Sequence, residues 1–108
     1  LWIDSVFLHG FSHGSKAQLG GKKLLLSFTT GAPQSVYSPE GAFRHPVEDY
    51  LHPFETTAVL CDLELQTPVY TSGISYVSRD DESKVLEQKA AAKEHAIRLI
   101  SVIRRLTA

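Results

Sequence analysis

The 108-residue sequence lacks several features that would point to particular classes of protein. It has no methionine and only one cysteine, Cys61. A single cysteine excludes an intrachain disulfide framework and a cysteine-based zinc site. A reducing, cytoplasmic compartment is therefore the simplest setting. The formal net charge of −1 gives no electrostatic case for a nucleic-acid partner or an anionic membrane surface. The apolar runs are far shorter than a bilayer span, so the sequence predicts no membrane-crossing segment.

The first residues have the pattern of an amphipathic helix that is already under way. Apolar side chains recur at helical spacing and would share one side: Trp2, Ile3, Val6 and Phe7. Because no capping residue or lead-in precedes them, we expect this helix to continue a segment upstream. We therefore predict that residues 1–108 form the C-terminal part of a larger domain. We also expect the apolar side of this helix and the adjoining loop to mediate self-association.

An unbroken run of three leucines within residues 22–28 is the clearest strand signal. Such a run favours a parallel strand covered on both faces over a half-exposed strand. The strand ends in Thr29, Thr30 and Gly31, and in open α/β sheets ligands bind beyond the carboxyl ends of strands. Gly31 has no Cβ, so its backbone can approach a flat ligand, and the two threonines add hydroxyl groups. The alternative is a strand followed by an ordinary turn.

The middle of the chain alternates between loop, helix and strand patterns. Residues 31–46 contain three prolines and predict a long loop. Residues 47–61 carry a helical apolar stripe, in which Pro53 either lies near the true start of the helix or kinks it. Residues 63–69 alternate between apolar and polar side chains and predict a second strand. The right-handed strand–helix–strand rule makes this strand a parallel neighbour of residues 22–28.

The last part of the chain predicts a long helix. Ser78 can cap it, and residues 74–77 could extend the preceding strand. One apolar stripe runs along the helix: Val85, Ala92, Ala96, Leu99, Ile103 and Leu106. The order helix, strand, loop, helix, strand, helix is that of a doubly wound α/β sheet.

Several short blocks of sequence together indicate a family. In chain order they are Trp2-Ile3-Asp4-Ser5-Val6-Phe7, Gly10-Phe11-Ser12, Thr29-Thr30-Gly31, Ser35-Val36-Tyr37, His45-Pro46, Leu51-His52-Pro53-Phe54-Glu55, and residues 63–68 and 80–106. With these blocks the sequence resembles the flavodoxin-like NAD(P)H:quinone oxidoreductases, which include DT-diaphorase and bacterial ancillary subunits of glutathione-gated potassium efflux systems. The resemblance implies a flavodoxin-like doubly wound parallel sheet. It also implies that residues 1–108 supply the C-terminal half of this domain and lack the N-terminal half with its phosphate-binding loop.

The resemblance assigns one group of residues to a flavin, FMN or FAD. By this resemblance the flavin ring edge is lined by Thr29, Thr30, Gly31 and Ala32. Backbone N–H groups suit that position because they can stabilise negative charge on the ring without reorganising. The family often has a second glycine where Ala32 stands, so the loop has less conformational freedom here. Tyr37 matches a family tyrosine whose hydroxyl points at the flavin, and the alternative is a half-buried packing tyrosine.

The resemblance also suggests residues for proton transfer and substrate binding. DT-diaphorase pairs its tyrosine with a histidine six residues on, where this sequence has Phe43, and His45 lies two residues further. His45 is therefore a candidate proton relay, with a solvated loop histidine as the alternative. A loop that covers the nicotinamide and quinone pocket matches four residues here: Phe11, Ser12, His13 and Gly14. An aromatic or imidazole face in that loop would stack on a planar substrate, as would Phe43.

The remaining histidines and the cysteine are given structural roles. His9 and His13 are four residues apart, but the glycines around them argue against the helix that a two-histidine metal face needs, so we expect no metal. His52 and His95 are expected to face solvent on their helices. Cys61 lies on an apolar stripe and is expected to be a small core residue.

The favoured function is that of an enzyme that moves hydride from NAD(P)H to the flavin and then to a quinone-like acceptor. The family also suggests a homodimer. One alternative is a flavodoxin-like ancillary subunit that regulates a potassium efflux system, with a membrane transporter as its partner. Another is that residues 1–108 alone are an inactive fragment, because half of the flavin site would be missing.

Overall fold

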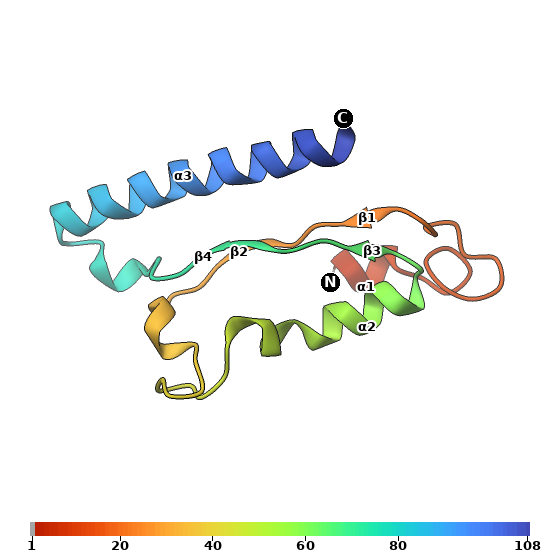
Figure 1. The fold of residues 1–108 in the computed structure, drawn as a ribbon, viewed down its shortest axis with the longest axis horizontal. Coiled ribbons are helices and arrows are strands. Elements are labelled where there is room, and N and C mark those ends of the chain that lie inside the picture. The colour runs from red at the N-terminus through yellow and green to blue at the C-terminus, as the bar shows by residue number, and fades with distance from the viewer. Residues whose placement is uncertain (1) are drawn as a thin grey trace. The chain divides into compact units, whose positions relative to one another are not determined.

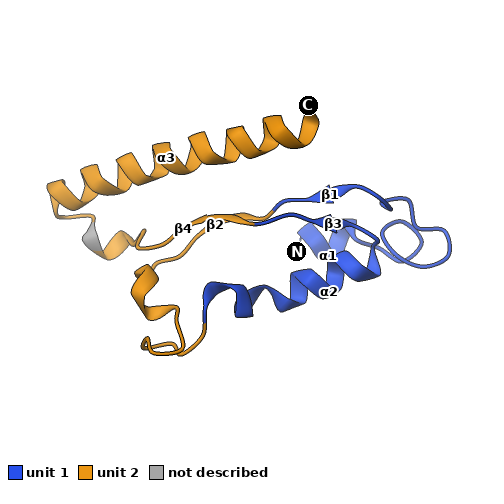
Figure 2. Cartoon of the chain, in the orientation of Figure 1, with its two compact units in different colours: residues 1–25, 46–67 blue, residues 26–45, 68–108 orange. Residues whose placement is uncertain are grey.

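The computed structural model describes residues 2–108, with the side chain of Ser78 left out. The chain divides into two compact units, residues 1–25 with 46–67 and residues 26–45 with 68–108 (Figure 2). Figure 1 shows the helices and strands, which are α1 (Trp2–Val6), β1 (Lys23–Leu24), β2 (Ser27–Thr29), α2 (His52–Leu60), β3 (Glu64–Leu65), β4 (Val69–Thr71) and α3 (Glu82–Thr107). Short 3₁₀ helices occupy Gln34–Val36, Val47–Leu51 and Tyr76–Ser78.

The first unit contains α1, β1, α2 and β3. Strands β1 and β3 are parallel, with Lys23 opposite Glu64. Helix α2 begins only at His52, and Pro53 lies in its first turn, where a missing N–H costs no helical hydrogen bond. The stretch before it is a 3₁₀ helix, so the question that Pro53 raised in the sequence is answered without a kink.

The core of the first unit is small. Val47, Ala58 and Cys61 are each 3% exposed, and Ser12 is fully buried. The burial of Cys61 confirms its expected role as a small core residue and keeps its free thiol away from solvent.

The second unit contains β2, β4 and α3. Strands β2 and β4 are parallel, and their paired residues include Ser27 with Val69 and Thr29 with Thr71. Together with the β1–β3 pair, this confirms the prediction that residues 22–28 and 63–69 are parallel neighbours. Each pair has only two strands within the described residues, so the leucine run at Leu24–Leu26 is half-buried rather than covered on both faces.

Both predicted strands are interrupted. Leu25 and Leu26 separate β1 from β2, and Gln66, Thr67 and Pro68 separate β3 from β4. Pro68 carries no N–H and so cannot donate to a ladder, which explains a break at that point. The backbone hydrogen bonds resume with Val69 N–H donating to the Leu26 carbonyl at 2.9 Å. The possible extension over residues 74–77 is wrong, since β4 ends at Thr71 and a 3₁₀ helix follows.

Helix α3 begins later than predicted. Its N-cap is Asp81, whose carboxylate accepts hydrogen bonds from the N–H groups of Ser83 and Lys84, so the cap assigned to Ser78 is wrong. The side chain of Ser78 lies outside the described part of the chain. The Ser83 hydroxyl and the Lys84 N–H, as hydrogen-bond donors, hold the pKa of Asp81 below its ordinary value.

The covered face of α3 differs from the predicted stripe. Its less exposed positions are Val85, Gln88, Ala91, His95, Leu99, Val102 and Leu106. Three members of the predicted stripe, Ala92, Ala96 and Ile103, are exposed instead. The prediction that His95 faces solvent is also wrong, because its ring hydrogen-bonds to side chains of both β2 and β4. Polar contacts therefore help to choose the face that α3 presents to its strands.

Gly41 gives a stability prediction. A Cβ at this residue would lie 2.5 Å from the Ser35 carbonyl oxygen, and backbone atoms cannot move aside easily. A Cβ at Gly31 would meet only the Ile74 carbonyl oxygen, at 3.9 Å, which is ordinary contact. Gly41→Ala should therefore lower the free energy of unfolding by about 1–3 kcal/mol, and Gly31→Ala should leave it nearly unchanged. Urea unfolding monitored by circular dichroism measures both, and equal stability of the two variants would contradict the packing around Gly41.

Candidate functional site

The loop that follows β2 lies at the carboxyl ends of two parallel strands. Its first residue, Thr30, donates its N–H to the Thr71 carbonyl at 3.0 Å, and the Thr30 carbonyl accepts from the N–H of Ile74 at 3.0 Å. One step further, the N–H of Gly73 donates to the Ala32 carbonyl at 2.9 Å. The last residue of β4 and the loop that follows it therefore hold the loop after β2 by three backbone hydrogen bonds, which fix the peptide planes around Gly31.

Two consecutive N–H groups in this loop are left without a partner. Among the described residues, the N–H groups of Gly31 and Ala32 donate to no atom of the chain. The Thr30 hydroxyl, by contrast, donates to the Ala32 carbonyl at 3.1 Å and so stabilises the loop itself. Because the surrounding atoms would tolerate a Cβ at Gly31, the packing of the chain does not by itself require glycine there. The free donors and the bare Cα give this loop the properties of a binding edge.

A pocket of about 370 Å³ adjoins the same loop. It is lined by Gly31, Pro33, Ser72, Gly73, Ile74, Ser75, Lys84, Glu87, Gln88 and Ala91. The residues from α3 follow helical spacing and so point from one face into the pocket. Gln88 is fixed by a hydrogen bond from its amide to the Ser75 carbonyl at 3.1 Å. The volume lies within the range of small-molecule sites, and the lining mixes backbone, hydroxyl and charged groups.

Tyr37 and Phe43 form an aromatic pair in the loop between β2 and α2. Their rings meet edge to face with centroids 5.4 Å apart, and the Phe43 N–H donates to the Val36 carbonyl at 3.1 Å. Tyr37 is half-buried, whereas Phe43 is 48% exposed and presents an open aromatic surface. His45 is exposed at the end of the loop. The structure therefore brings Tyr37 and Phe43 into contact.

The first unit contains the other group of predicted residues. The fully buried Ser12 donates its hydroxyl to the Leu8 carbonyl at 3.2 Å, and its oxygen lies 3.1 Å from Nδ1 of His13. Both line a pocket of about 280 Å³ with Ile3, Asp4, Phe7, Thr57, Leu60 and Cys61. Phe11 is 42% exposed and is not among the lining residues.

Gly14 has a structural explanation. Its φ is +93°, and a Cβ there would lie 2.8 Å from a carbon of the His9 ring. The imidazoles of His9 and His13 meet edge to face at 5.2 Å. The turn around Gly14 therefore accommodates the packed His9 ring. Of the four predicted loop residues, only Ser12 and His13 line the pocket of this unit.

A family model described as the flavodoxin-like fold matches residues 1–96. The chain belongs to this family. Its flavodoxin-like α/β fold, predicted from the sequence, is thereby confirmed.

Two curated relatives in the flavodoxin-like family are bacterial ancillary proteins. The glutathione-regulated potassium-efflux system ancillary proteins KefG of Serratia proteamaculans and of Pectobacterium carotovorum are each 38% identical to the chain over 92 residues. In both comparisons the match covers 84% of this chain and 48% of the relative. The chain therefore spans about half the length of the curated relatives that it matches.

Two solved structures share the flavodoxin-like fold. General stress protein 14 of Treponema denticola, determined in complex with FMN, has a TM-score of 0.73 and 31% identity over 93% of this chain and 54% of its own. An NADPH-quinone reductase of P. pentosaceus has a TM-score of 0.64 over 83% of this chain and 55% of its own. At 23% identity this second likeness concerns the fold alone.

Several residues of this flavodoxin-like chain could not be found from its sequence. His95 and Arg98 on α3 both bond to Thr71, and no motif marks them. The one available signal is spacing, because His95 lies four residues before Leu99 on the covered face. Within the described residues, no group of three potential ligands could hold a metal ion, and no helix has the length and apolarity that a membrane span requires.

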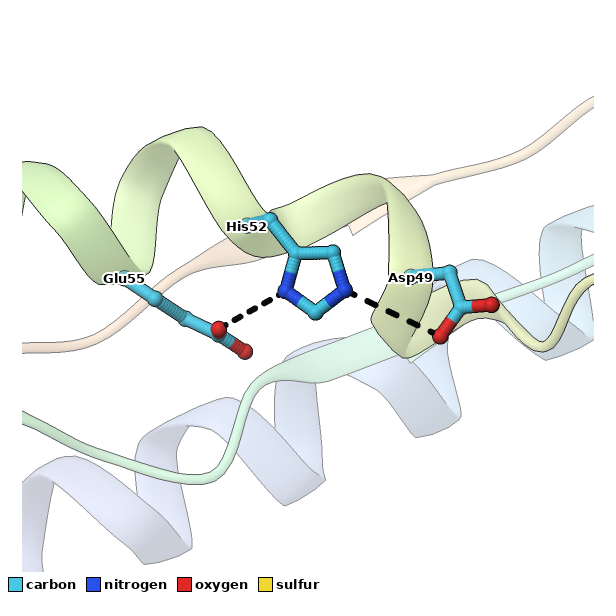
Figure 3. A network of polar contacts seen from close by, with 3 residues as sticks. All are labelled: Asp49, His52 and Glu55. Carbon is cyan, nitrogen blue, oxygen red and sulfur yellow. Dashed lines mark hydrogen bonds and ion pairs between the residues drawn. The ribbon is translucent and has the colours of Figure 1, made fainter.

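A surface histidine at the start of α2 lies between two carboxylates. His52 lies between Glu55 and Asp49 (Figure 3). Its Nδ1 is 2.9 Å from Glu55 Oε2 and its Nε2 is 3.9 Å from Asp49 Oδ1. The hydrogen bond and the charge of Glu55, with a smaller contribution from Asp49, raise the pKa of His52 above 6.5. Its exposure agrees with the sequence prediction.

The raised pKa of His52 has a pH consequence. Protonated His52 is favoured in the folded state, so its contribution to stability is complete below the unfolded pKa of 6.5 and is lost as the pH rises through the higher folded pKa. His52→Gln should therefore destabilise the protein near pH 6 and have little effect above about pH 8. Thermal unfolding across this range is the measurement, and Glu55→Gln should flatten the same profile. Parallel profiles for wild type and His52→Gln would contradict the assignment.

Proposed function

We propose that this chain forms one wall of the flavin site of an FMN-dependent NAD(P)H:quinone oxidoreductase. The observation that carries the proposal is the pair of free N–H groups at Gly31 and Ala32, held at the carboxyl ends of β2 and β4 beside a pocket. In open α/β sheets this edge is the usual ligand site. Membership of the flavodoxin-like family and the FMN complex of the 31% identical relative support FMN, with FAD as the alternative.

The residues present fit a flavin edge. The isoalloxazine ring has carbonyl oxygens and ring nitrogens that need hydrogen-bond donors, which the N–H groups of Gly31 and Ala32 supply, and Thr29 and Thr30 flank them. A flavin, when bound, accepts hydride from NAD(P)H and passes it to a quinone. The contribution of the chain is to offer donors that are already oriented by two bonds, one from the Thr30 N–H to the Thr71 carbonyl and one from the Gly73 N–H to the Ala32 carbonyl.

Two residues of the second unit are proposed to act on charge and protons. Tyr37 would donate a hydrogen bond to charge that develops on the ring, and its contact with Phe43 restricts the orientation of its phenol. His45, exposed in the same loop, would exchange the proton with solvent. The open face of Phe43 suits a planar quinone-like acceptor.

The loop of residues 11–14 in the first unit is proposed to bind the nicotinamide or the quinone. Ser12 and His13 line the pocket of that unit; the buried Ser12 hydroxyl, which is bonded to the Leu8 carbonyl, lies 3.1 Å from Nδ1 of His13 and would orient the imidazole toward a substrate. The exposed ring of Phe11 and the turn at Gly14 would complete the loop against the nicotinamide or the quinone.

We further propose that residues 1–108 are the C-terminal portion of the flavodoxin-like domain and that the domain is a homodimer in the cytoplasm. The half-length match to the relatives supports the first part. So does the apolar surface of α3, where Leu86 is 66% and Ile97 is 65% exposed. On the first unit Trp2 is 68% exposed, which supports an apolar contact with a second copy.

A second candidate function is that of an ancillary subunit that regulates a potassium efflux transporter. The 38% identity to the KefG proteins favours it. The two functions are compatible, since a flavin site can sense redox state while the protein contacts a membrane partner.

The flavin edge is tested by Gly31→Ala in the full-length polypeptide that carries these residues. Since a Cβ at Gly31 meets only the Ile74 carbonyl at 3.9 Å, the fold should tolerate it. The same methyl group would obstruct a flat ring at the free N–H groups, so the affinity for FMN should fall about tenfold or more. Titration followed by flavin fluorescence gives the affinity. Unchanged binding in the folded variant would contradict the placement of the flavin at this loop.

The enzymatic part is tested by Tyr37→Phe in the same polypeptide. Loss of one hydrogen bond to developing charge, worth roughly 1.5–3 kcal/mol, should slow flavin reduction by NAD(P)H about ten- to a hundredfold. The variant should still bind FMN. Stopped-flow absorbance gives the reduction rate, with menadione as the quinone in steady-state assays. An unchanged rate makes Tyr37 a packing residue, and an FMN-loaded wild type that oxidises no NAD(P)H favours the ancillary function.

A further inference from the structure

We propose that His95 and Arg98 of α3 are positioning residues for the loop that offers the free N–H groups of Gly31 and Ala32, and that they act through Thr71. The inference rests on the proposed flavin function and adds to it the residues that set the loop geometry. It starts from Thr71, the last residue of β4. The backbone of Thr71 bonds to the loop after β2, and its side chain bonds to α3.

The backbone of Thr71 controls the flavin loop. Its carbonyl accepts the Thr30 N–H at 3.0 Å, and three residues later the Ile74 N–H donates to the Thr30 carbonyl at 3.0 Å. Both polar atoms of the Thr30 backbone are therefore bonded to the segment that begins at Thr71. Any displacement of Thr71 would tilt the peptide plane that precedes Gly31.

The side chain of Thr71 is held by α3. Its hydroxyl oxygen accepts from Nη2 of Arg98 at 2.7 Å and lies 2.8 Å from Nδ1 of His95. Arg98 also donates to the Tyr70 carbonyl at 3.1 Å, so one guanidinium nitrogen contacts both last residues of β4. The other ring nitrogen of His95 lies 2.8 Å from the Ser27 hydroxyl in β2. The two side chains therefore fix α3 to both strands that precede the loops.

Chemistry fixes the direction of the bond from Arg98, and the tautomer of His95 sets the direction of the two bonds that its ring makes. A guanidinium can only donate, so the oxygen of Thr71 accepts from Arg98 and its single hydroxyl hydrogen can be given to Nδ1 of His95. His95 then carries its proton on Nε2 and donates to the Ser27 hydroxyl. His95 uses a different ring nitrogen for each of its partners, whereas Arg98 uses Nη2 for both of its contacts and Thr71 uses its single hydroxyl for both of its side-chain contacts. Charge-assisted bonds such as that from Arg98 are short and directional, which suits a positioning role.

Removal of the Thr71 hydroxyl tests the proposal without requiring any flavin. Thr71→Val keeps the shape and the strand preference of the side chain but loses both bonds from α3. In the flavin-free full-length protein, the Thr30 and Ile74 amides should exchange with solvent about three- to tenfold faster. Thr71→Ser should restore the wild-type rates, and His95→Ala should reproduce the effect of Thr71→Val. Amide exchange by NMR reports each position separately.

A matched control separates positioning from general stability. Val102→Ala removes apolar contact from the covered face of α3 but touches none of the bonds to Thr71. If it accelerates the Thr30 and Ile74 amides as much as Thr71→Val does, the network only stabilises α3 and the proposal is overturned. Unchanged exchange in Thr71→Val would also overturn it.

The FMN-loaded protein supplies the second readout. A displaced loop should change the ratio of affinities for oxidised and reduced FMN by about three- to tenfold in Thr71→Val, because the two forms differ in charge at the ring edge. Val102→Ala should leave this ratio unchanged. If Thr71→Val alters amide exchange but leaves the ratio of FMN affinities unchanged, His95 and Arg98 stabilise the fold only. That outcome would overturn their proposed role in positioning the loop for the flavin. Absence of FMN binding in wild type would instead contradict the proposed function, and the exchange experiment would still decide the network.

Discussion

The parallel pairing of β2 with β4 is the constraint on which the candidate site depends. Because both strands run in one direction, their carboxyl ends meet at one edge, and Thr29 stands opposite Thr71. The loops that leave this edge therefore start side by side and bond to each other through the backbone of Thr30. An antiparallel pair would separate the two loops by the length of the strands. The free N–H groups at Gly31 and Ala32 follow from this pairing, because bonds elsewhere in the two loops hold the peptide groups around them in place.

Much of this architecture could be predicted from the sequence because it depends on local pattern and on the handedness of connections. The parallel neighbours, the late start of α2 at His52 and the burial of Cys61 all follow from apolar spacing, from proline chemistry and from the strand–helix–strand rule. The family resemblance rested on the order of short blocks, and the flavodoxin-like fold agrees with it. Each of these features depends only on residues that are close in sequence or on a single strand–helix–strand connection.

The features that were missed depend on contacts between distant residues. The observed cap of α3, Asp81, lies three residues after the predicted cap, Ser78. Helix ends are harder to predict from sequence than the helix itself. His95 was assigned to solvent because a histidine on a long helix is usually exposed. Its two hydroxyl partners, Ser27 and Thr71, lie 68 and 24 residues away in sequence, so helical periodicity could not reveal them. Their bonds lie on the covered face of α3, which includes Leu99 but leaves Ala92, Ala96 and Ile103 of the predicted stripe exposed.

The glycines differ in whether packing within the chain requires them. Gly14 and Gly41 are explained by the chain itself, since a Cβ would collide with the His9 ring in one case and with backbone oxygens in the other. Gly31 has ordinary φ and room for a methyl group, and its own N–H and that of Ala32 have no partner among the described residues. A glycine that packing does not require, beside N–H groups that the chain does not use, supports the proposal that a ligand binds at this loop.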